Sequence, residues 1–591
     1  MLSGRGNKTP ERAKNTGATL RRLWGYIARH KGLALAALAL SLIGNLLALV
    51  GPWLSGRAIN AINPGAGAVD FGQVFLYCAL MAVFYIASSV LGYIVSALMI
   101  KLSQSVISRL RREVQSRLLD LPVGYFDRHQ TGDIVSHISY DIDTLASSLS
   151  NDLIQVVASV VTVIGSLVMM LLISPPLVVV FAVTIPLSVL FTRYMSRKVR
   201  PLFRKRSKAL GELNGYAEEV ISGLKTVKAY RSEAVFTERF EEKNAEAAEA
   251  YYRAEYFGSI TGPAVNFINN LSLSFISVLG AALYLLGRMM LGDLSSFVLY
   301  SRKFSGPINE VANIVSELQS AAAAAERVFR ILDEQPEKPD APGAEEAGAV
   351  KGHVRVENVT FGYVPGRTIV KNFSMDAVPG SLIAIVGQTG AGKTTLINLL
   401  MRFYDPDSGV IRLDGRDISS LTRRSLRRSY AMVLQDTWLF RGTVAENIAY
   451  GSKKATREQI ISAAKAAMVH SFITGLPKGY DTVLDEEGQG VSQGQKQLLT
   501  IARAMLTDAH MLILDEATSS VDTRTERLIS DAMRRLMRDK TCFVIAHRLS
   551  TIQGADRILV VSDGEIAEQG SHAELMASGG IYAGLYAAQF E

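Results

Sequence analysis

The sequence predicts a membrane protein of two fold classes: an all-α domain of six transmembrane helices with long cytoplasmic extensions, fused to a cytosolic α/β domain. Long apolar stretches with few charges fill the first half of the 591-residue chain. From about Val350 onward, the composition becomes that of a soluble globular domain. A glycine-rich loop in this second half lies between an apolar strand-like run and a helix-like run, which is the context of a phosphate-binding loop.

The predicted spans follow from length and hydropathy. A helix needs about 20 apolar residues to cross about 30 Å of hydrocarbon. Five segments meet this condition: Leu33–Leu54, Phe75–Ile100, Leu153–Ile173, Pro176–Met195 and Gly258–Leu286. A sixth, at about Leu294–Val315, is weaker because it carries Arg302, Lys303 and Glu310.

The distribution of basic residues predicts the topology. The two long connectors between predicted spans, Lys101–Asp152 and Ser196–Phe257, together contain about 20 Lys and Arg. The short connectors between the other spans contain only Arg288. Basic loops stay cytoplasmic, so six spans place both termini and the second domain on the cytoplasmic side of the membrane. Topology therefore explains the net charge of +8 better than nucleic-acid binding does, and the sequence has no basic stripe with interleaved aromatics.

The long connectors are amphipathic and rich in helical patterns, so we expect the spans to continue as helices into the cytoplasm; small inserted soluble domains are the alternative. The charged residues of the sixth span either line a wet cavity or pair and snorkel near the ends of the span. Asn269 and Asn270 are interpreted as interhelical hydrogen-bonding residues. Cys78 and Cys542 have no neighbouring metal-ligand set and are predicted to be packing residues.

The predicted domains have approximate borders. Residues 1–18 form a basic, disordered tail, which is not a cleavable signal because no small-residue cleavage site ends the apolar run after it. Residues 19–330 form the transmembrane domain, residues 331–350 a linker, and residues 351–591 the nucleotide-binding domain.

The phosphate loop fits the pattern G-x-x-x-x-G-K-[ST]. Its glycines let backbone N–H groups approach the phosphates of a nucleotide, and the helix that follows directs its positive end at them. Lys393 is expected to reach the β- and γ-phosphates, and the Thr394 hydroxyl to bind Mg²⁺. The loop residues are Gly387, Gln388, Thr389, Gly390, Ala391, Gly392, Lys393, Thr394 and Thr395.

A second candidate site element is the apolar run Met511–Leu514, which ends in two acids. We expect Asp515 to hold Mg²⁺ through water and Glu516 to act as the general base toward the attacking water.

Together with five further motifs in a fixed order, these two elements resemble an ABC transporter of the exporter type (type IV), specifically a half-transporter. The resemblance covers the chain from about residue 20. It implies that Tyr363 stacks on adenine, that Gln435 contacts Mg²⁺ and the water, and that His547 contacts the γ-phosphate. It also implies that Ser492, Gln493, Gly494 and Gln495 form the signature motif and that Asp522 belongs to the D-loop of Ser520-Val521-Asp522.

The membrane half contains two segments that resemble the cytoplasmic loops of these exporters. Phe126–Asp141 resembles the first loop, with a coupling helix near residues 126–145, and Ser222–Tyr230 resembles the second, near residues 222–233. The resemblance implies that the first coupling helix touches both nucleotide domains of a dimer and that the second reaches the opposite one.

One departure from the family pattern bears on the assembly. The signature is typically Leu-Ser-Gly-Gly-Gln, whereas this chain has Gln493 in place of the first glycine. Glycine allows close backbone approach to the γ-phosphate held by the opposite chain, and a side chain there crowds it. The intact Glu516 beside a degenerate signature resembles one subunit of heterodimeric bacterial multidrug or lipid exporters. A homodimer with neutral drift at Gln493 is the alternative.

We therefore expect ATP-driven export, or leaflet flipping, of amphipathic substrates such as drugs, lipids or peptides. ATP and Mg²⁺ are the expected cofactors, and a second half-transporter and the lipid bilayer are the expected partners. A homodimeric lipid flippase or exporter, and a regulatory or ATP-gated subunit with little turnover, are the alternative functions. Nucleic acid is not an expected partner.

Overall fold

The structure is a computed structural model of the chain. It describes residues 16–62, 69–435, 437–452, 454–484, 490–515, 522–545 and 552–590, without the side chains of residues 16, 308–313, 589 and 590. The chain divides into two compact units, one of Met1–Leu121 with His129–Glu334 and one of Pro122–Arg128 with Gln335–Glu591.

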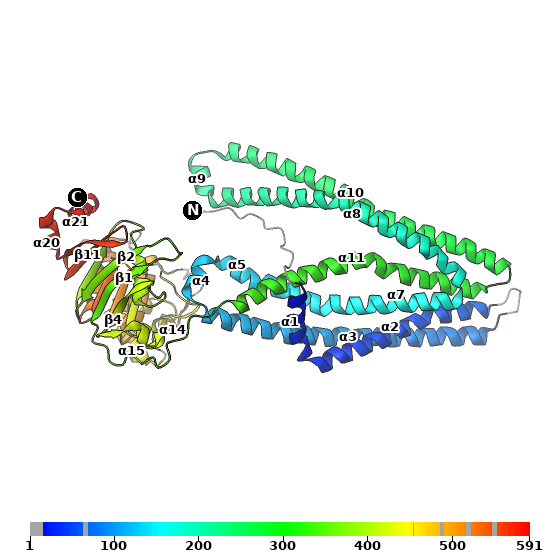
Figure 1. Cartoon of the computed structure of the whole chain (residues 1–591), viewed down its shortest axis with the longest axis horizontal. Coiled ribbons are helices and arrows are strands. Elements are labelled where there is room, and N and C mark those ends of the chain that lie inside the picture. The colour runs from blue at the N-terminus through cyan, green and yellow to red at the C-terminus, as the bar shows by residue number, and fades with distance from the viewer. Residues whose placement is uncertain are drawn as a thin grey trace. The chain divides into compact units, whose positions relative to one another are not determined.

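The first unit is built from long helices (Figure 1). They are α1 (Thr16–Ala28), α2 (Lys31–Asn60), α3 (Phe71–Asp120), α7 (Leu153–Ile173), α8 (Pro175–Ser222), α10 (Glu233–Leu285) and α11 (Leu291–Asp333). Shorter helical segments complete it: α5 (Thr131–Ser136), η1 (His137–Asp141), α6 (Ile142–Ser147), η2 (Ser148–Asp152) and α9 (Leu224–Ala229).

Several of these helices are much longer than a membrane crossing requires. At 1.5 Å per residue, the 50 residues of α3 extend about 75 Å, against about 30 Å of hydrocarbon. The helices α8 and α10 have 48 and 53 residues, so the predicted helical extensions are confirmed. The first long connector, Lys101–Asp152, is not a simple extension of the spans. Between α3 and α7 it consists of short helices and the π-helical segments η1 and η2.

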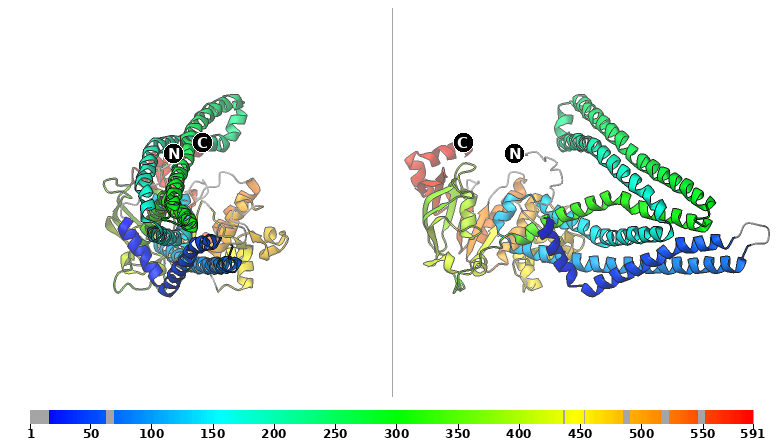
Figure 2. Two further views of the ribbon diagram at one scale, coloured as in Figure 1. Left: turned by 90° about the vertical axis from the view of Figure 1, so that its right-hand side faces the viewer. Right: turned by 45° about the vertical axis from the view of Figure 1, so that its right-hand side comes forward.

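In the part of the chain that the structure describes, five helical segments are long and apolar enough to cross a membrane: Lys31–Asn60, Phe71–Asp120, Thr131–Ile173, Pro175–Ser222 and Glu233–Leu285. They contain the first five predicted spans. The sixth predicted span lies within α11, which does not reach the same hydropathy over the residues that the structure describes. Figures 1 and 2 show α8 and α10 side by side as an antiparallel pair, separated over much of its length from α2, α3, α7 and α11.

Close contacts hold α11 against α2. A Cβ on Gly56 would lie 2.5 Å from the carbonyl oxygen of Gly292, so only glycine permits this approach of the two backbones. The Gly292 N–H donates to Asn60 Oδ1 at 2.7 Å, and the Tyr300 hydroxyl donates to the Leu49 carbonyl at 2.5 Å. Hydrogen bonds of this kind supply partners to polar groups for which lipid tails offer none.

A partly buried ion pair joins the first connector to α11. Arg327 donates to both carboxylate oxygens of Asp141, from Nε at 2.8 Å and from Nη2 at 2.5 Å. His137 Nδ1 lies 2.7 Å from the same carboxylate. Burial alone would raise the pKa of Asp141, but the hydrogen bonds from Arg327 and His137 hold it below its ordinary value.

The second unit contains two larger sheets. A six-stranded sheet has the order β12-β11-β3-β10-β9-β6, in which all neighbours are parallel except β11 and β12. Its strands are β3 (Leu382–Val386), β6 (Tyr430–Val433), β9 (Met511–Asp515), β10 (Thr541–Ile545), β11 (Arg557–Ser562) and β12 (Glu565–Gly570). An antiparallel sheet of order β2-β1-β4-β5 comprises β1 (Val354–Phe361), β2 (Val370–Ala377), β4 (Ser408–Leu413) and β5 (Arg416–Asp417).

Two apolar clusters cover the two faces of the parallel sheet, and every residue of β10 is buried. Strands buried on both faces are expected in a parallel sheet. The helices of this unit are α4 (Val123–Arg128), α12 (Lys393–Leu400), α13 (Arg423–Arg428), α14 (Val444–Ala449), α15 (Arg457–Ala466), α16 (His470–Thr474), α17 (Gln493–Met505), α18 (Thr523–Met537), α20 (His572–Ser578) and α21 (Ile581–Phe590). The 3₁₀ turns η3 (Ile418–Ser420) and η4 (Gly479–Asp481) and the short strands β7 (Gly442–Thr443) and β8 (Val483–Leu484) complete it.

The two cysteines differ. Cys542 is buried in β10, as expected for a packing residue. Cys78 is exposed on α3, so the prediction that it packs into the core is wrong within this chain. An apolar stretch that faces lipid or another subunit has the same composition as one that faces a core, which is why the sequence did not separate the two cases.

Candidate nucleotide-binding site

The parallel sheet gathers the predicted site residues at one edge. The strands β3, β10, β9 and β6 are parallel neighbours, so the segments that follow them meet at the same edge. The phosphate loop follows β3, Asp515 ends β9, and Gln435 follows β6. The carboxyl edge of such a sheet is where open α/β folds bind ligands.

Backbone conformation explains the glycines of the phosphate loop. Gly390 has φ +87° and Gly392 has φ +101°, both in the left-handed region that glycine adopts without strain. Gly387 has φ +153°, and a Cβ there would lie 2.2 Å from the Val561 carbonyl oxygen on β11. The loop therefore needs glycine at these positions to curl over the start of α12.

The Lys393 side chain folds back over its own loop. Its ammonium donates to the carbonyls of Gly387 at 2.6 Å and Gln388 at 3.0 Å. Burial lowers the pKa of Lys393, and the nearby charge of Asp515 opposes that shift. An ammonium that is hydrogen-bonded to backbone carbonyls is available to a polyphosphate, which offers a stronger, charge-assisted partner.

Three oxygen-bearing side chains at this edge fit a magnesium ion. Thr394 and Gln435 are exposed, and Asp515 stands at the end of β9. Hydroxyl, amide and carboxylate oxygens are hard ligands of the kind that Mg²⁺ takes alongside phosphate oxygens and water. Among the described residues, no group of three or more His, Cys, Asp and Glu lies close enough to bind a metal by itself.

Tyr363 lies just beyond β1 with a partly exposed ring. Its hydroxyl donates to Thr395 Oγ1 at 3.2 Å and accepts from Asn398 Nδ2 at 3.1 Å, which ties the ring to α12. Phe361 and Tyr404 contact it edge-on, with ring centroids 5.1 and 4.9 Å away. An anchored aromatic ring beside the phosphate loop has the geometry that base stacking needs.

The signature segment begins α17. Ser492 is the N-cap: its hydroxyl accepts from the Gln495 N–H at 3.3 Å, and the Gln495 side chain accepts from the Ser492 N–H at 2.9 Å. This capping box leaves the helix N-terminus well formed, with Gly494 buried against the domain.

Gln493 makes a contact that the sequence did not predict. Its side-chain amide donates to Thr437 Oγ1 at 3.3 Å, so it reaches the segment that follows Gln435. Thr437 carries no family motif in the sequence, and no sequence signal pointed to it.

Some predicted site residues lie outside the described residues, namely Glu516, Ser520, Val521 and His547. Asp522 is described and caps α18, where its carboxylate accepts from the N–H groups of Arg524 and Thr525 at 3.1 and 3.0 Å. These hydrogen bonds hold the pKa of Asp522 below its usual value.

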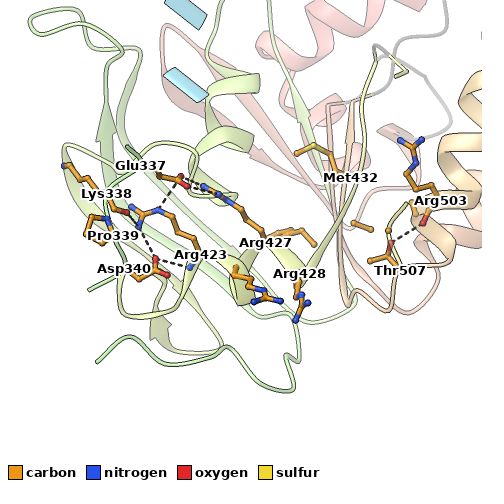
Figure 3. Close-up of a pocket in the computed structure, with 15 residues that line it drawn as sticks. Glu337, Lys338, Pro339, Asp340, Arg423, Arg427, Arg428, Met432, Arg503 and Thr507 are labelled. Atoms are coloured by element: carbon orange, nitrogen blue, oxygen red, sulfur yellow. Dashed lines mark hydrogen bonds and ion pairs between the residues drawn. The ribbon is translucent and has the colours of Figure 1, made fainter. Parts of the chain in front are cut away.

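An ion-pair cluster fixes the segment Glu337–Asp340 on α13 (Figure 3). We call Arg423, Glu337, Asp340 and Asp405 the linker clamp. Arg423 is 7% exposed, and its guanidinium lies 3.0 Å from Asp340, 3.2 Å from Asp405 and 3.6 Å from Glu337. A cavity of about 740 Å³ lies beside the clamp and is bordered on its other side by Arg503.

The second unit also contains α4, which the sequence placed in the first cytoplasmic loop. The Tyr404 hydroxyl donates to the carboxylate of Asp127 on α4. Burial and this hydrogen bond raise the pKa of Tyr404. Tyr404 also contacts Tyr363, whose ring is predicted to stack on adenine. Tyr404 is therefore a common neighbour of α4 and of Tyr363.

Known proteins share both halves of this arrangement. Residues 34–308 match the ABC transporter transmembrane region, and residues 370–519 match the family model described as ABC transporter. The chain belongs to the ABC transporter family, and the order of its two regions makes it an exporter-type half-transporter. It has an ATP-binding domain whose hydrolysis of ATP is coupled to transport.

Three bacterial proteins resemble the chain along most of its length. An uncharacterized ABC transporter ATP-binding protein of Bacillus subtilis is 42% identical over 99% of this chain and 96% of its own length. A fatty acid ABC transporter ATP-binding/permease protein of Mycobacterium tuberculosis is 46% identical over 88% of this chain and 82% of its own. An ATP-dependent lipid A-core flippase of Aliivibrio fischeri is 35% identical over 98% of this chain and all of its own length.

The fold agrees with a solved structure. A bacterial Atm1-family ABC exporter with ATP bound superposes with a TM-score of 0.76 and 30% identity, over 95% of this chain and 98% of that one. The predicted fold class is thereby confirmed.

Proposed function

We propose that this chain is one half of an exporter that moves amphipathic molecules, with lipids favoured over drugs and peptides, across or between the leaflets of the inner membrane. The observation that supports it most directly is the convergence of the phosphate loop, Asp515 and Gln435 at one sheet edge in a chain with five strongly apolar membrane helices. The names of two relatives, a fatty acid transporter and a lipid A-core flippase, support lipids as the substrate class.

The proposed division of labour follows from the geometry. The loop from Gly387 to Thr395 holds the phosphates, with Lys393 released from its two carbonyls to the polyphosphate. Tyr363 stacks on adenine. Thr394, Gln435 and Asp515 hold Mg²⁺, which when bound neutralises phosphate charge. Glu516 accepts a proton from the attacking water, and His547 contacts the γ-phosphate.

We further propose that residues 19–330 form the membrane domain and 351–591 the nucleotide domain, with 331–350 as the linker. Both termini are then cytoplasmic. Closure of two nucleotide domains on ATP would change the equilibrium between inward- and outward-facing membrane domains, because ATP binds the closed state better. Hydrolysis of ATP would then reset the equilibrium between the two states of the membrane domains.

The proposed partner is a different half-transporter. Ser492, Gln493, Gly494 and Gln495 and the D-loop residue Asp522 would face the ATP of that partner. Gln493 replaces the usual glycine there, while the chain's own loop and Glu516 keep the full pattern. A homodimer is the alternative. Native mass spectrometry of the tagged complex, purified from the source membrane, separates the two: a second chain supports the heterodimer, and a complex of only this chain contradicts it.

The Glu516→Gln variant tests the catalytic role in proteoliposomes. General-base catalysis contributes on the order of 10²- to 10⁴-fold, so ATP hydrolysis should fall by at least two orders of magnitude while ATP still binds. Glu565→Gln on the exposed edge of β12 is the matched control and should leave the rate unchanged. Undiminished hydrolysis in Glu516→Gln would eliminate Glu516 as the principal base. Wild-type protein that binds ATP but barely turns over would instead favour a regulatory or ATP-gated subunit.

A further inference from the structure

Charges within the six predicted spans are few and unbalanced. The first, second, third and fifth spans contain no Asp, Glu, Lys or Arg at all. The fourth contains Arg193 near its end, and the sixth contains Arg302, Lys303 and Glu310. Glu310 is therefore the single acid in the spans, and it can neutralise at most one of the two adjacent cations. The chain leaves at least one positive charge in its sixth span without an acidic partner of its own.

Lys303 lies deep in that span. The helix α11 begins at Leu291, and the apolar segment begins at about Leu294. Nine residues at 1.5 Å per residue place Lys303 about 14 Å into the span, near the middle of about 30 Å of hydrocarbon. From this depth the four-carbon stem of a lysine cannot carry its ammonium to either membrane surface.

Buried aromatic residues lie next to Lys303 on α11. Tyr300 and Phe304, which flank it on α11, are buried, and Phe304 packs edge-on against Phe181 of α8 with centroids 5.2 Å apart. Lys303 is half-buried beside them. Among the described side chains, no carboxylate forms an ion pair with it. Arg302 lies roughly 100° around the helix and is exposed.

A charge in this position is costly, at about 2.5–3.5 kcal/mol on insertion scales. It is retained in spans mainly where it faces a water-filled pathway or an anion. We propose that Lys303 binds the anionic head group of the transported molecule, so that the substrate is an amphiphile with a carboxylate or phosphate head and an apolar tail. This inference rests on the export function proposed above and narrows its substrate class. The tail would contact the uncharged spans, and the ammonium would select for the negative head.

The test compares amphiphiles that differ only in the head group. The assembled transporter is reconstituted in phosphatidylcholine vesicles, and ATP hydrolysis is measured against rising oleate, 1-oleoyl-lysophosphatidate or oleyl alcohol. Oleate and the lysophosphatidate distinguish a carboxylate from a phosphate source. In wild type, at least one of the anionic compounds should stimulate hydrolysis at lower concentration than oleyl alcohol does.

The Lys303→Met variant should raise the half-stimulating concentration of that anionic compound about tenfold, the equivalent of about 1.4 kcal/mol, and leave the response to oleyl alcohol unchanged. Lys303→Arg should retain the wild-type response because it keeps the charge. Arg288→Gln, in the outer connector, controls for the general loss of a positive charge and should not shift either curve.

Binding of the fluorescent fatty acid cis-parinaric acid without ATP provides a second measurement that does not require turnover. Its affinity should fall about tenfold in Lys303→Met and stay unchanged in Arg288→Gln. Equal responses to anionic and neutral compounds, or a Lys303→Met variant with wild-type affinity, would overturn the head-group assignment and leave amphiphile export standing. If no amphiphile binds or stimulates in wild type, the export proposal fails, and the assignment fails with it.

Discussion

The side chain of Gln493, at the N-terminus of α17, donates a hydrogen bond to Thr437 Oγ1 at 3.3 Å. Gln493 lies in the predicted signature motif, and Thr437 follows the predicted magnesium ligand Gln435 by two residues. The Gln493 side chain therefore links two segments of one nucleotide domain. A glycine could not make this contact.

Removal of this link should affect the response to substrate more than basal hydrolysis. A neutral hydrogen bond contributes about 0.5–1.5 kcal/mol, so Gln493→Gly and Thr437→Val should each change substrate-stimulated hydrolysis roughly 2- to 10-fold. Because both variants remove the same bond, the double variant should be no worse than either single one. Additive effects in this double-mutant cycle would show that the two side chains act separately.

The linker clamp should stabilise the nucleotide domain. Arg423→Met leaves Glu337, Asp340 and Asp405 without their shared cation, which should cost about 1–3 kcal/mol in free energy of unfolding. The thermal midpoint should fall by about 2–4 °C per kcal/mol, as measured by scanning calorimetry of the detergent-solubilised protein. The neighbouring Arg424 is exposed and forms no ion pair with the described residues, so Arg424→Met should leave the midpoint unchanged. Equal losses in both variants would contradict the clamp.

Tyr363 should determine the affinity for the base. Base–aromatic stacking contributes about 1–3 kcal/mol, so Tyr363→Ala should weaken ATP binding by roughly 5- to 150-fold in equilibrium titrations. Tyr363→Phe keeps the ring and loses only the bonds to Thr395 and Asn398, so its affinity should stay within a few-fold of wild type. If both variants bind ATP as wild type does, the ring does not stack on adenine.

Cys542 should be unreactive in the folded protein. Burial in β10 raises the pKa of its thiol to about 12, and the thiolate is the species that reacts with maleimide. In a Cys78→Ser background, labelling should stay slow between pH 7 and 9, whereas an ordinary exposed thiol gains thiolate steeply over this range. Denaturation should make Cys542 fully reactive. A labelling rate in the native protein that equals the rate of an ordinary exposed thiol at the same pH would contradict its burial.

The sequence alone determined the fold class, five of the membrane helices and the glycine-rich loop. These features depend on local patterns: apolar runs of span length, and glycines whose φ values of +87° and +101° other residues adopt only with strain. It also supplied Asp515, which ends a short apolar strand, whereas Gln435 was predicted only from the family resemblance. Their convergence could be expected from the general rule that parallel strands end at one edge of a sheet.

Only the tertiary structure decided which distant residues meet. The bond from Gln493 to Thr437 and the clamp on Arg423 join segments 56 and 83–86 residues apart, and no periodicity or motif encodes such pairs. The exposure of Cys78 likewise depends on which neighbour covers α3, not on its apolar composition. Hydropathy and backbone preference are properties of a short segment, whereas hydrogen bonds and ion pairs between segments require the packed sheet and helices that bring them within 3 to 4 Å.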